Sequence, residues 1–196
     1  MQPMIVILAG GQGSRIGGGK PLRHLAGQAL IERALNRAHS WSDDVRLALR
    51  ASGQVGDIGA PVLIDDPDVW GPLAGLSSAL AAARQSGRSH VMTIPCDMPF
   101  LPEDLWKRLS AAIGGELVAM AASGDQLHPV CALWSVRALD ALPAYLAAGR
   151  RSLKGLAETV GMVVVDWPEQ VFANINTPEE LADAERRFRS EVEDVE

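Results

Sequence analysis

The sequence MIVILAGGQGSRIGGGK, residues 4–20, carries the strongest indication of the fold of this chain. It opens with the apolar run Met4 to Leu8 and continues into a loop that holds six glycines, Arg15 and Lys20. A short unbroken apolar run is typical of a strand buried on both faces, as in a parallel sheet. Glycine is costly to order, so a loop this rich in it indicates that a ligand approaches the backbone closely.

Apolar runs and helical periodicities alternate over the first 110 residues. This alternation predicts an α/β fold in three layers, a mostly parallel sheet with helices on both faces. The half after about Gly115 is less regular and is expected to add an antiparallel edge strand. The predicted strands cover residues 4–8, 45–49, 62–64, 90–94, 117–121, 130–134 and 163–165. The predicted helices lie near residues 30–38, near 72–83, from Pro102, and from a capping box at residues 177–180.

Composition limits the function classes. The chain has 196 residues, of which 47% are hydrophobic and 21% charged, as expected of a soluble globular domain. No apolar run approaches the roughly 20 residues that a membrane-spanning helix needs. The net charge of −6 argues against nucleic acid as a partner. Two cysteines, Cys96 and Cys131, are too few for a disulfide framework or a zinc site, so we expect a cytoplasmic protein.

The glycine loop follows the first strand, and ligands of open α/β sheets bind at the carboxyl ends of strands. Backbone N–H groups of such a loop, together with its two cations, favour a phosphate-bearing ligand. A Walker loop does not fit, because Ser14 replaces its first glycine and Pro21 its hydroxyl residue. A dinucleotide fingerprint fits weakly, because Ile16 stands where its third glycine belongs.

The loop resembles the signature of nucleotidyltransferases that join a nucleoside monophosphate to a phosphorylated acceptor, and within them the molybdenum cofactor guanylyltransferases. Further matching motifs are VLID (62–65), GPLAG (71–75), PCDMPF (95–100), HP (128–129) and NINTPEEL (174–181). The resemblance extends over nearly the whole chain and implies a Rossmann-like nucleotidyltransferase fold in one domain, residues 1–196. Residues 1–110 would then bind the nucleotide and residues 111–196 the acceptor, with an acidic tail at 190–196.

The resemblance also implies roles for the glycine loop. The backbone of Leu8, Ala9 and Gly10 would hold the base and ribose of the nucleotide. Gly11 and Gly13 would turn the chain around the phosphates.

Charged residues complete the implied catalytic site. Lys20 would stabilise the transferring phosphate and the departing pyrophosphate, with help from Arg15. Asp97, two residues beyond a predicted strand, would hold Mg²⁺, because a carboxylate and triphosphate oxygens together suit that ion. Asp65 matches a nucleotide-site aspartate of the family.

Other polar residues point toward the acceptor. The resemblance implies that Asn174 and Asn176 lie near the pterin, although asparagine is also common in turns. His128 fits either a substrate contact or a structural histidine. The basic cluster Arg150, Arg151 and Lys154 fits either an acceptor phosphate site or a solvated surface.

The implied reaction takes GTP and molybdopterin and yields pyrophosphate and the guanine dinucleotide cofactor, which molybdoenzymes or their chaperones would receive. The chain departs from the family pattern in two places. The loop before Lys20 is one residue short and lacks its aspartate, which affects how Lys20 reaches the phosphates; residues 45–52 contain no asparagine, which affects the contact with the base or ribose. A molybdopterin cytidylyltransferase, a sugar-phosphate nucleotidyltransferase, a GTP-binding delivery module and a dehydrogenase remain as alternatives.

Overall fold

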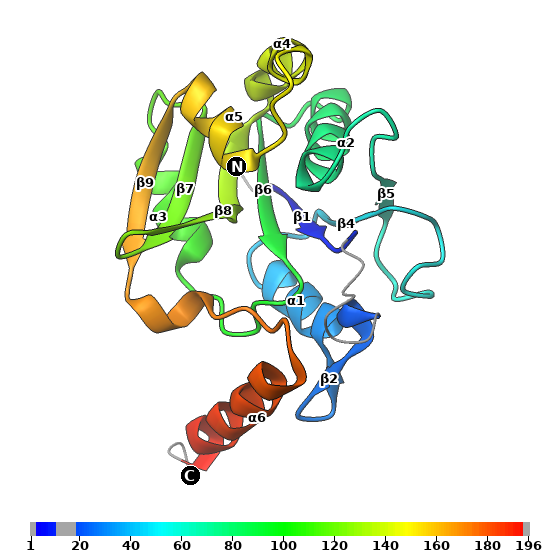
Figure 1. Cartoon of the computed structure of the whole chain (residues 1–196), viewed down its shortest axis with the longest axis vertical. Coiled ribbons are helices and arrows are strands. Elements are labelled where there is room, and N and C mark those ends of the chain that lie inside the picture. Colours follow the sequence, from blue (N-terminus) through cyan, green and yellow to red (C-terminus); the bar gives the residue numbers. More distant parts are fainter. Residues whose placement is uncertain (1–2, 11–18, 194–196) are drawn as a thin grey trace.

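A seven-stranded sheet runs through the computed structural model, which describes residues 3–10 and 19–193 (Figure 1). The strands, in spatial order, are β5 (Val62–Ile64), β4 (Val45–Leu49), β1 (Met4–Leu8), β6 (His90–Pro95), β8 (Gln126–Ser135), β7 (Val118–Ser123) and β9 (Met162–Trp167). Strands β5, β4, β1 and β6 pair in parallel, as do β7 and β9. The predicted mostly parallel α/β fold is therefore confirmed.

The antiparallel strand lies inside the sheet rather than at its edge. β8 pairs antiparallel with β6 on one side and with β7 on the other. After β6 the chain crosses one strand position to reach β7, and the turn at Gly124, with φ of 55°, returns β8 into the gap. The edge position is taken by β9, because its parallel pairing with β7 adds a further strand.

Helices cover both faces of the sheet, because side chains alternate along each buried strand. On β1, Ile5 and Ile7 pack in one apolar cluster, while Met4 and Val6 pack in the other. The first cluster includes α1 (Leu30–His39) and α3 (Leu105–Ala112). The second includes α2 (Pro72–Gln85), α4 (Leu142–Ala147) and α5 (Leu153–Val160). None of the helices in the described residues is long and apolar enough to span a membrane.

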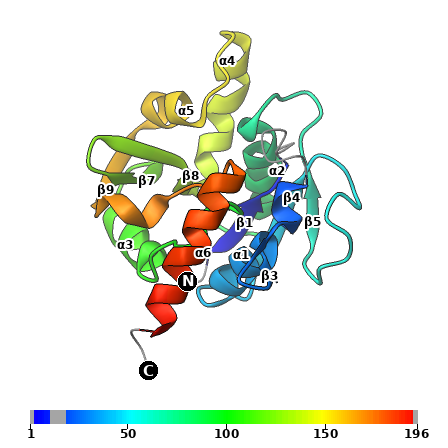
Figure 2. The ribbon, with the colours of Figure 1, turned by 60° about the horizontal axis from the view of Figure 1, so that its bottom comes forward.

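The last helix, α6 (Pro178–Glu193), packs on a small hairpin made of β2 (His24–Leu25) and β3 (Gln28–Ala29). Leu25, Ile175 and Ala184 share a separate apolar cluster at this contact. In Figure 2 the end of the molecule that carries α6 comes forward, and the helix crosses in front of the strand ends. This arrangement brings the C-terminal segment next to elements from the first 30 residues of the chain.

Several predicted boundaries differ from the structure. The strands predicted at 130–134 and 163–165 are longer, as β8 and β9. The helix expected from Pro102 begins at Leu105, after a turn. Residues 190–193 of the expected acidic tail belong to α6, while residues 194–196 lie outside the described residues. The hairpin β2–β3, the helix α4 and the 3₁₀ turns were not predicted, because elements this short carry little periodicity. The helix α5, as long as α3 with 8 residues, was also not predicted.

Candidate active site

The carboxyl ends of β1, β4, β5 and β6 meet at one edge of the sheet, and a cavity of about 260 Å³ opens there. Because the four strands are parallel, the loops that follow them converge on this edge. The cavity is lined by Leu8, Gly10, Ala48, Arg50, Asp65, Gly71, Pro72, Gly75, Pro95, Asp97, Val130 and Asn174. Of the residues implied for the site, Gly11, Gly13 and Arg15 lie outside the described residues.

Lys20, Asp97 and Asn176 are in direct contact. The Nζ of Lys20 lies 2.5 Å from Oδ2 of Asp97 and 2.8 Å from Oδ1 of Asn176. The side chains of Lys20 and Asp97 are only 13% and 21% exposed. Lys20 follows Gly19, whose φ of 59° is left-handed, and opens a 3₁₀ turn over Lys20–Leu22. The structure thus joins three loops that are as far as 156 residues apart in sequence.

Asp65, the residue directly after β5, lies between two glycines. A Cβ placed on Gly10 would meet Oδ2 of Asp65 at 2.6 Å, and one on Gly75 would meet Oδ1 at 3.1 Å. A Cβ at either position would therefore displace the carboxylate from its present place. Burial raises the pKa of the Asp65 carboxyl, and the positive charge of Arg50 lowers it. The result is a partly dehydrated carboxylate beside the cavity.

The motif GPLAG serves both helix packing and the cavity. A Cβ on Gly75 would also crowd Leu8 at 3.0 Å and Ala48 at 3.1 Å, so this glycine lets α2 approach the sheet. Gly71 and Pro72, at the start of α2, line the cavity as well. The same short motif therefore allows close packing of α2 and forms part of the cavity wall.

The backbone after β1 is held by the loop that follows β4. Ala9 is buried, and its N–H donates to the carbonyl of Ala48 at 3.0 Å. The Nε2 of Gln54 donates to the Ala9 carbonyl at 3.1 Å, while its Oε1 accepts from the N–H of Arg50 at 3.2 Å. This glutamine provides an amide side chain in a loop whose first residues contain no asparagine. Leu8 and Gly10 line the cavity on either side of Ala9.

Sequence reasoning missed Arg50 and Gln54. Arg50 directly follows β4, so the rule that placed Asp97 at the strand ends would also have found Arg50. Gln54 carried no such signal, because its contact depends on how the loop folds back over Ala9.

Backbone hydrogen bonds hold the segment 174–176, which contains the two asparagines, to the loop of Asp97 and to the start of α6. Asn174 lines the cavity, and the N–H of Ile175 donates to the Asp97 carbonyl at 2.9 Å. Glu180 completes the predicted capping box: its Oε2 accepts from the N–H of Asn176 at 2.5 Å and of Thr177 at 3.0 Å. The Thr177 hydroxyl accepts from the N–H of Glu180 at 3.2 Å. The start of α6 therefore sets the position of Asn176 against Lys20.

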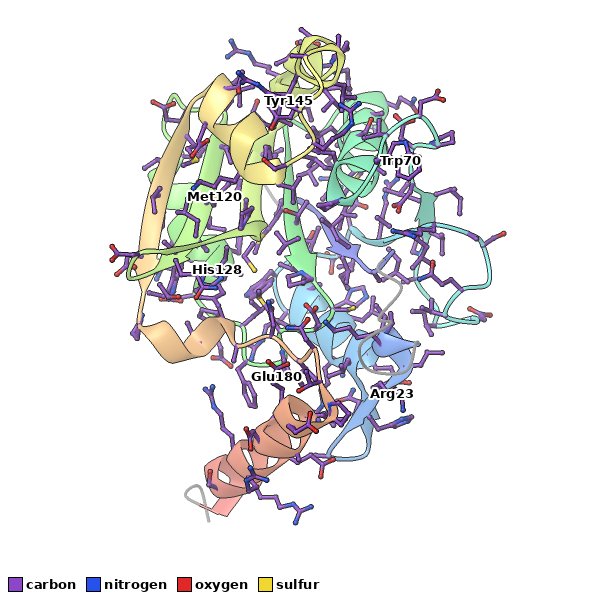
Figure 3. The ribbon with its side chains drawn as sticks, in the orientation of Figure 1. Arg23, Trp70, Met120, His128, Tyr145 and Glu180 are labelled. Atoms are coloured by element: carbon purple, nitrogen blue, oxygen red, sulfur yellow. The ribbon has the colours of Figure 1, made fainter. Side chains whose placement is uncertain are left out.

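The basic cluster of Arg150, Arg151 and Lys154 does not line the strand-end cavity. Arg150 and Arg151 are exposed beside Tyr145, at the end of the molecule opposite to Glu180 (Figure 3). Lys154 pairs with Glu158 at 3.7 Å. The interpretation of this cluster as an acceptor phosphate site is therefore wrong, and the solvated alternative holds.

Cys96 lies next to Asp97 but is buried, as is Cys131. Burial, and to a smaller degree the charge of Asp97, raises the pKa of the Cys96 thiol to about 12. The thiol therefore stays protonated at neutral pH and fills space as a small apolar group.

Comparison with known proteins identifies the family. The model of the MobA-like NTP transferase domain matches residues 5–162. A molybdenum cofactor guanylyltransferase of Rhodopseudomonas palustris is 40% identical, over 92% of this chain and 91% of its own length. The protein of that name from Cereibacter sphaeroides is 38% identical, over 95% and 97%.

Two solved structures are similar to this chain over most of its length. Molybdopterin-guanine dinucleotide biosynthesis protein A of Archaeoglobus fulgidus superposes with a TM-score of 0.76 at 25% identity, over 95% of this chain and 98% of its own. The 2-C-methyl-D-erythritol 4-phosphate cytidylyltransferase of Thermus thermophilus, at 18% identity and a TM-score of 0.72, shares the fold over 96% of this chain and 100% of its own. From the family match and these relatives, we conclude that the chain belongs to the MobA-like NTP transferase family.

Proposed function

We propose that this protein transfers GMP from GTP to the terminal phosphate of molybdopterin, with molybdenum bound, and releases pyrophosphate. The observation that carries the proposal is the contact between Lys20 and Asp97 beside a cavity built from four strand ends. Relatives at 40% and 38% identity, each named molybdenum cofactor guanylyltransferase, support the choice of substrates.

The reaction needs positioning and charge more than proton transfer. An oxygen of the acceptor phosphate attacks the α-phosphorus of GTP, and the bond from that phosphorus to the oxygen bridging to the β-phosphate breaks. Pyrophosphate leaves with the electron pair of that bond. The attacking phosphate is already ionised at neutral pH, so holding it in line is the main task of the protein.

Lys20 is suited to the phosphates. Its ammonium group has three N–H donors, of which Asp97 and Asn176 accept two. Within the described residues the third N–H has no partner, so it is available to a phosphate oxygen. Because Asp97 and Asn176 fix the direction of the ammonium group, Lys20 would stabilise the charge of the transferring phosphate without first reorganising.

The residues present fit Mg²⁺. Among the described residues, the side chains at the cavity and its rim that suit Mg²⁺ offer hard oxygen donors: the carboxylates of Asp97 and Asp65 and the amide oxygens of Asn174 and Asn176. Among residues 3–10 and 19–193, no three His, Cys, Asp or Glu side chains group as a metal site. Asp97 would hold the ion, and bound Mg²⁺ would neutralise charge on the triphosphate. Magnesium in such sites takes its other ligands from phosphates and water.

The compartment of the reaction and the proteins that receive its product are part of the same proposal. Both cysteines are unpaired, which fits the reducing cytoplasm. Molybdoenzymes or their chaperones would receive the product.

A direct assay tests the proposal: purified protein, Mg²⁺ and molybdenum-loaded molybdopterin are mixed with GTP, CTP, ATP or UTP, and pyrophosphate is followed. We expect release with GTP, loss of release in Lys20→Met, and unchanged release in Lys107→Met, which alters an exposed lysine. Release with CTP alone would contradict the assignment of the base. A GTP-induced thermal shift that needs no Mg²⁺, with no pyrophosphate, would indicate a delivery module instead.

A further inference from the structure

A second cavity, of about 450 Å³, adjoins the site at Asn174. Its volume is that of an ordinary small-molecule pocket. The segment that separates it from the first cavity includes Ile175, which is bonded to the Asp97 carbonyl. A molecule in the second cavity would therefore lie next to the residue proposed to hold the metal. Its principal lining side chains are Phe100, Gln126, His128, Phe172, Asp183 and Arg187.

Flat groups border this cavity. The guanidinium of Arg187 lies 4.0 Å from the centre of the Phe100 ring. The rings of His128 and Phe172 are stacked, with centres 4.3 Å apart and planes within 22°. Planar heteroaromatic molecules pack well against such faces, and an arginine adds a cation–π contribution.

His128 offers a polar group with an unused bond. The residue is only 4% exposed, and its Nε2 shares a hydrogen bond of 2.6 Å with the Ser123 hydroxyl. Nδ1 has no hydrogen-bond partner within the described part of the chain, and His128 lines the cavity. Burial lowers the pKa of His128, so the ring is neutral at pH 7. A neutral imidazole can donate to or accept from a ligand.

Carboxylates border the other side of the cavity, on α6. Glu180 and Asp183 both line it, and their spacing of three residues places them on the same helix face. Figure 3 shows Glu180 at the start of α6 and His128 on β8. Glu180 is engaged in the capping box, whereas Asp183 pairs with the exposed Arg186. A carboxylate is the natural acceptor for two adjacent N–H donors, the pattern on the aminopyrimidinone edge of a pterin.

We propose that this second cavity holds the ring system of the acceptor: Asp183 accepts from its aminopyrimidinone edge, the Phe100–Arg187 pair stacks on its face, and His128 Nδ1 bonds to it. The assignment rests on the proposed function, since it supplies the acceptor that Lys20 and Asp97 would serve. A pterin seated here would extend its phosphate past Asn174 toward the first cavity.

The test uses Asp183→Asn and Phe100→Leu in the full chain. Glu185→Gln is the matched control, because Glu185 lies on the same helix and pairs with Arg189 instead of bordering the cavity. Binding of fluorescent 6-hydroxymethylpterin is titrated first. We expect saturable binding to the unaltered protein, about tenfold weaker binding in the two cavity variants, and no change in the control. The thermal shift induced by GTP should be the same in all four proteins.

The KM for molybdopterin in the GTP assay is the second measurement, and it should rise in parallel with the binding constant while the KM for GTP stays constant. Absence of saturable pterin binding, or equal binding by all variants, would overturn the inference. If the protein transferred no GMP but bound the pterin with the same dependence on Asp183 and Phe100, the proposed function would fail and the cavity assignment would stand. Intact GMP transfer with an unchanged acceptor KM in both cavity variants would refute the cavity assignment alone.

Discussion

The ion pair between Lys20 and Asp97 allows a double-mutant cycle with Lys20→Met and Asp97→Asn. Coulomb's law at their separation of 2.5 Å yields about 2 kcal/mol at the dielectric constant of water and about 7 kcal/mol at an effective value of 20. The side chains are 13% and 21% exposed, so the pair is only partly screened. Desolvation offsets much of the attraction, and Asn176 still bonds the ammonium group when Asp97 is neutral. We expect a net coupling of about 1–3 kcal/mol in the free energy of unfolding.

Urea unfolding of the four proteins, without nucleotide or Mg²⁺, measures this coupling. Lys107→Met is the control, and its effect should stay within about 0.5 kcal/mol, as for other surface substitutions. A coupling below about 0.5 kcal/mol would show that the two side chains act independently, because distant sites add to within that margin. The contact that carries the proposed function would then be absent in solution.

The same proteins test catalysis. Each single substitution should lower kcat about 10²-fold or more, as expected when one group that stabilises transition-state charge is removed. The kcat of the double variant should be close to that of the less active single variant, because the effects of residues that act as a unit do not add. If the loss of kcat in the double variant equalled the product of the two single losses, the joint action of Lys20 and Asp97 would be refuted.

Three further perturbations follow from the packing of the site. Gly10→Ala places its Cβ 2.6 Å from an Asp65 carboxylate oxygen and should raise the KM for nucleotide several-fold, whereas Gly115→Ala, which meets nothing within 4 Å, should leave steady-state kinetics unchanged. Glu180→Ala removes two hydrogen bonds to backbone N–H groups and should cost about 1–2 kcal/mol of unfolding free energy in urea, with no loss being the contrary outcome. Both cysteines should resist a thiol reagent at pH 8 in the native protein and react once it unfolds, because burial raises their pKa values; rapid native labelling would contradict this.

Much of the site was predictable because its parts lie at strand ends. The run Met4 to Leu8 is a buried strand in the structure, as its composition indicated. Asp97 follows β6 by two residues, and Asp65 directly follows β5. Since parallel strands place their carboxyl ends at one edge, local order along the chain was enough to bring these residues to one cavity. The capping box at Thr177 and Glu180 was equally local.

Local patterns therefore predicted the seven strands of the sheet, the helices α1, α2, α3 and α6, and the loops at the strand ends, because hydrophobic period and capping act between residues a few positions apart. Three features depend on the packing in three dimensions: β8 lies inside the sheet, Asn176 meets Lys20 across 156 residues, and Asp65 lies between Gly10 and Gly75. These contacts depend on how the helices and strands pack against one another. A pattern along the chain does not record that packing, because the partners are far apart in sequence and are selected by shape and charge in space.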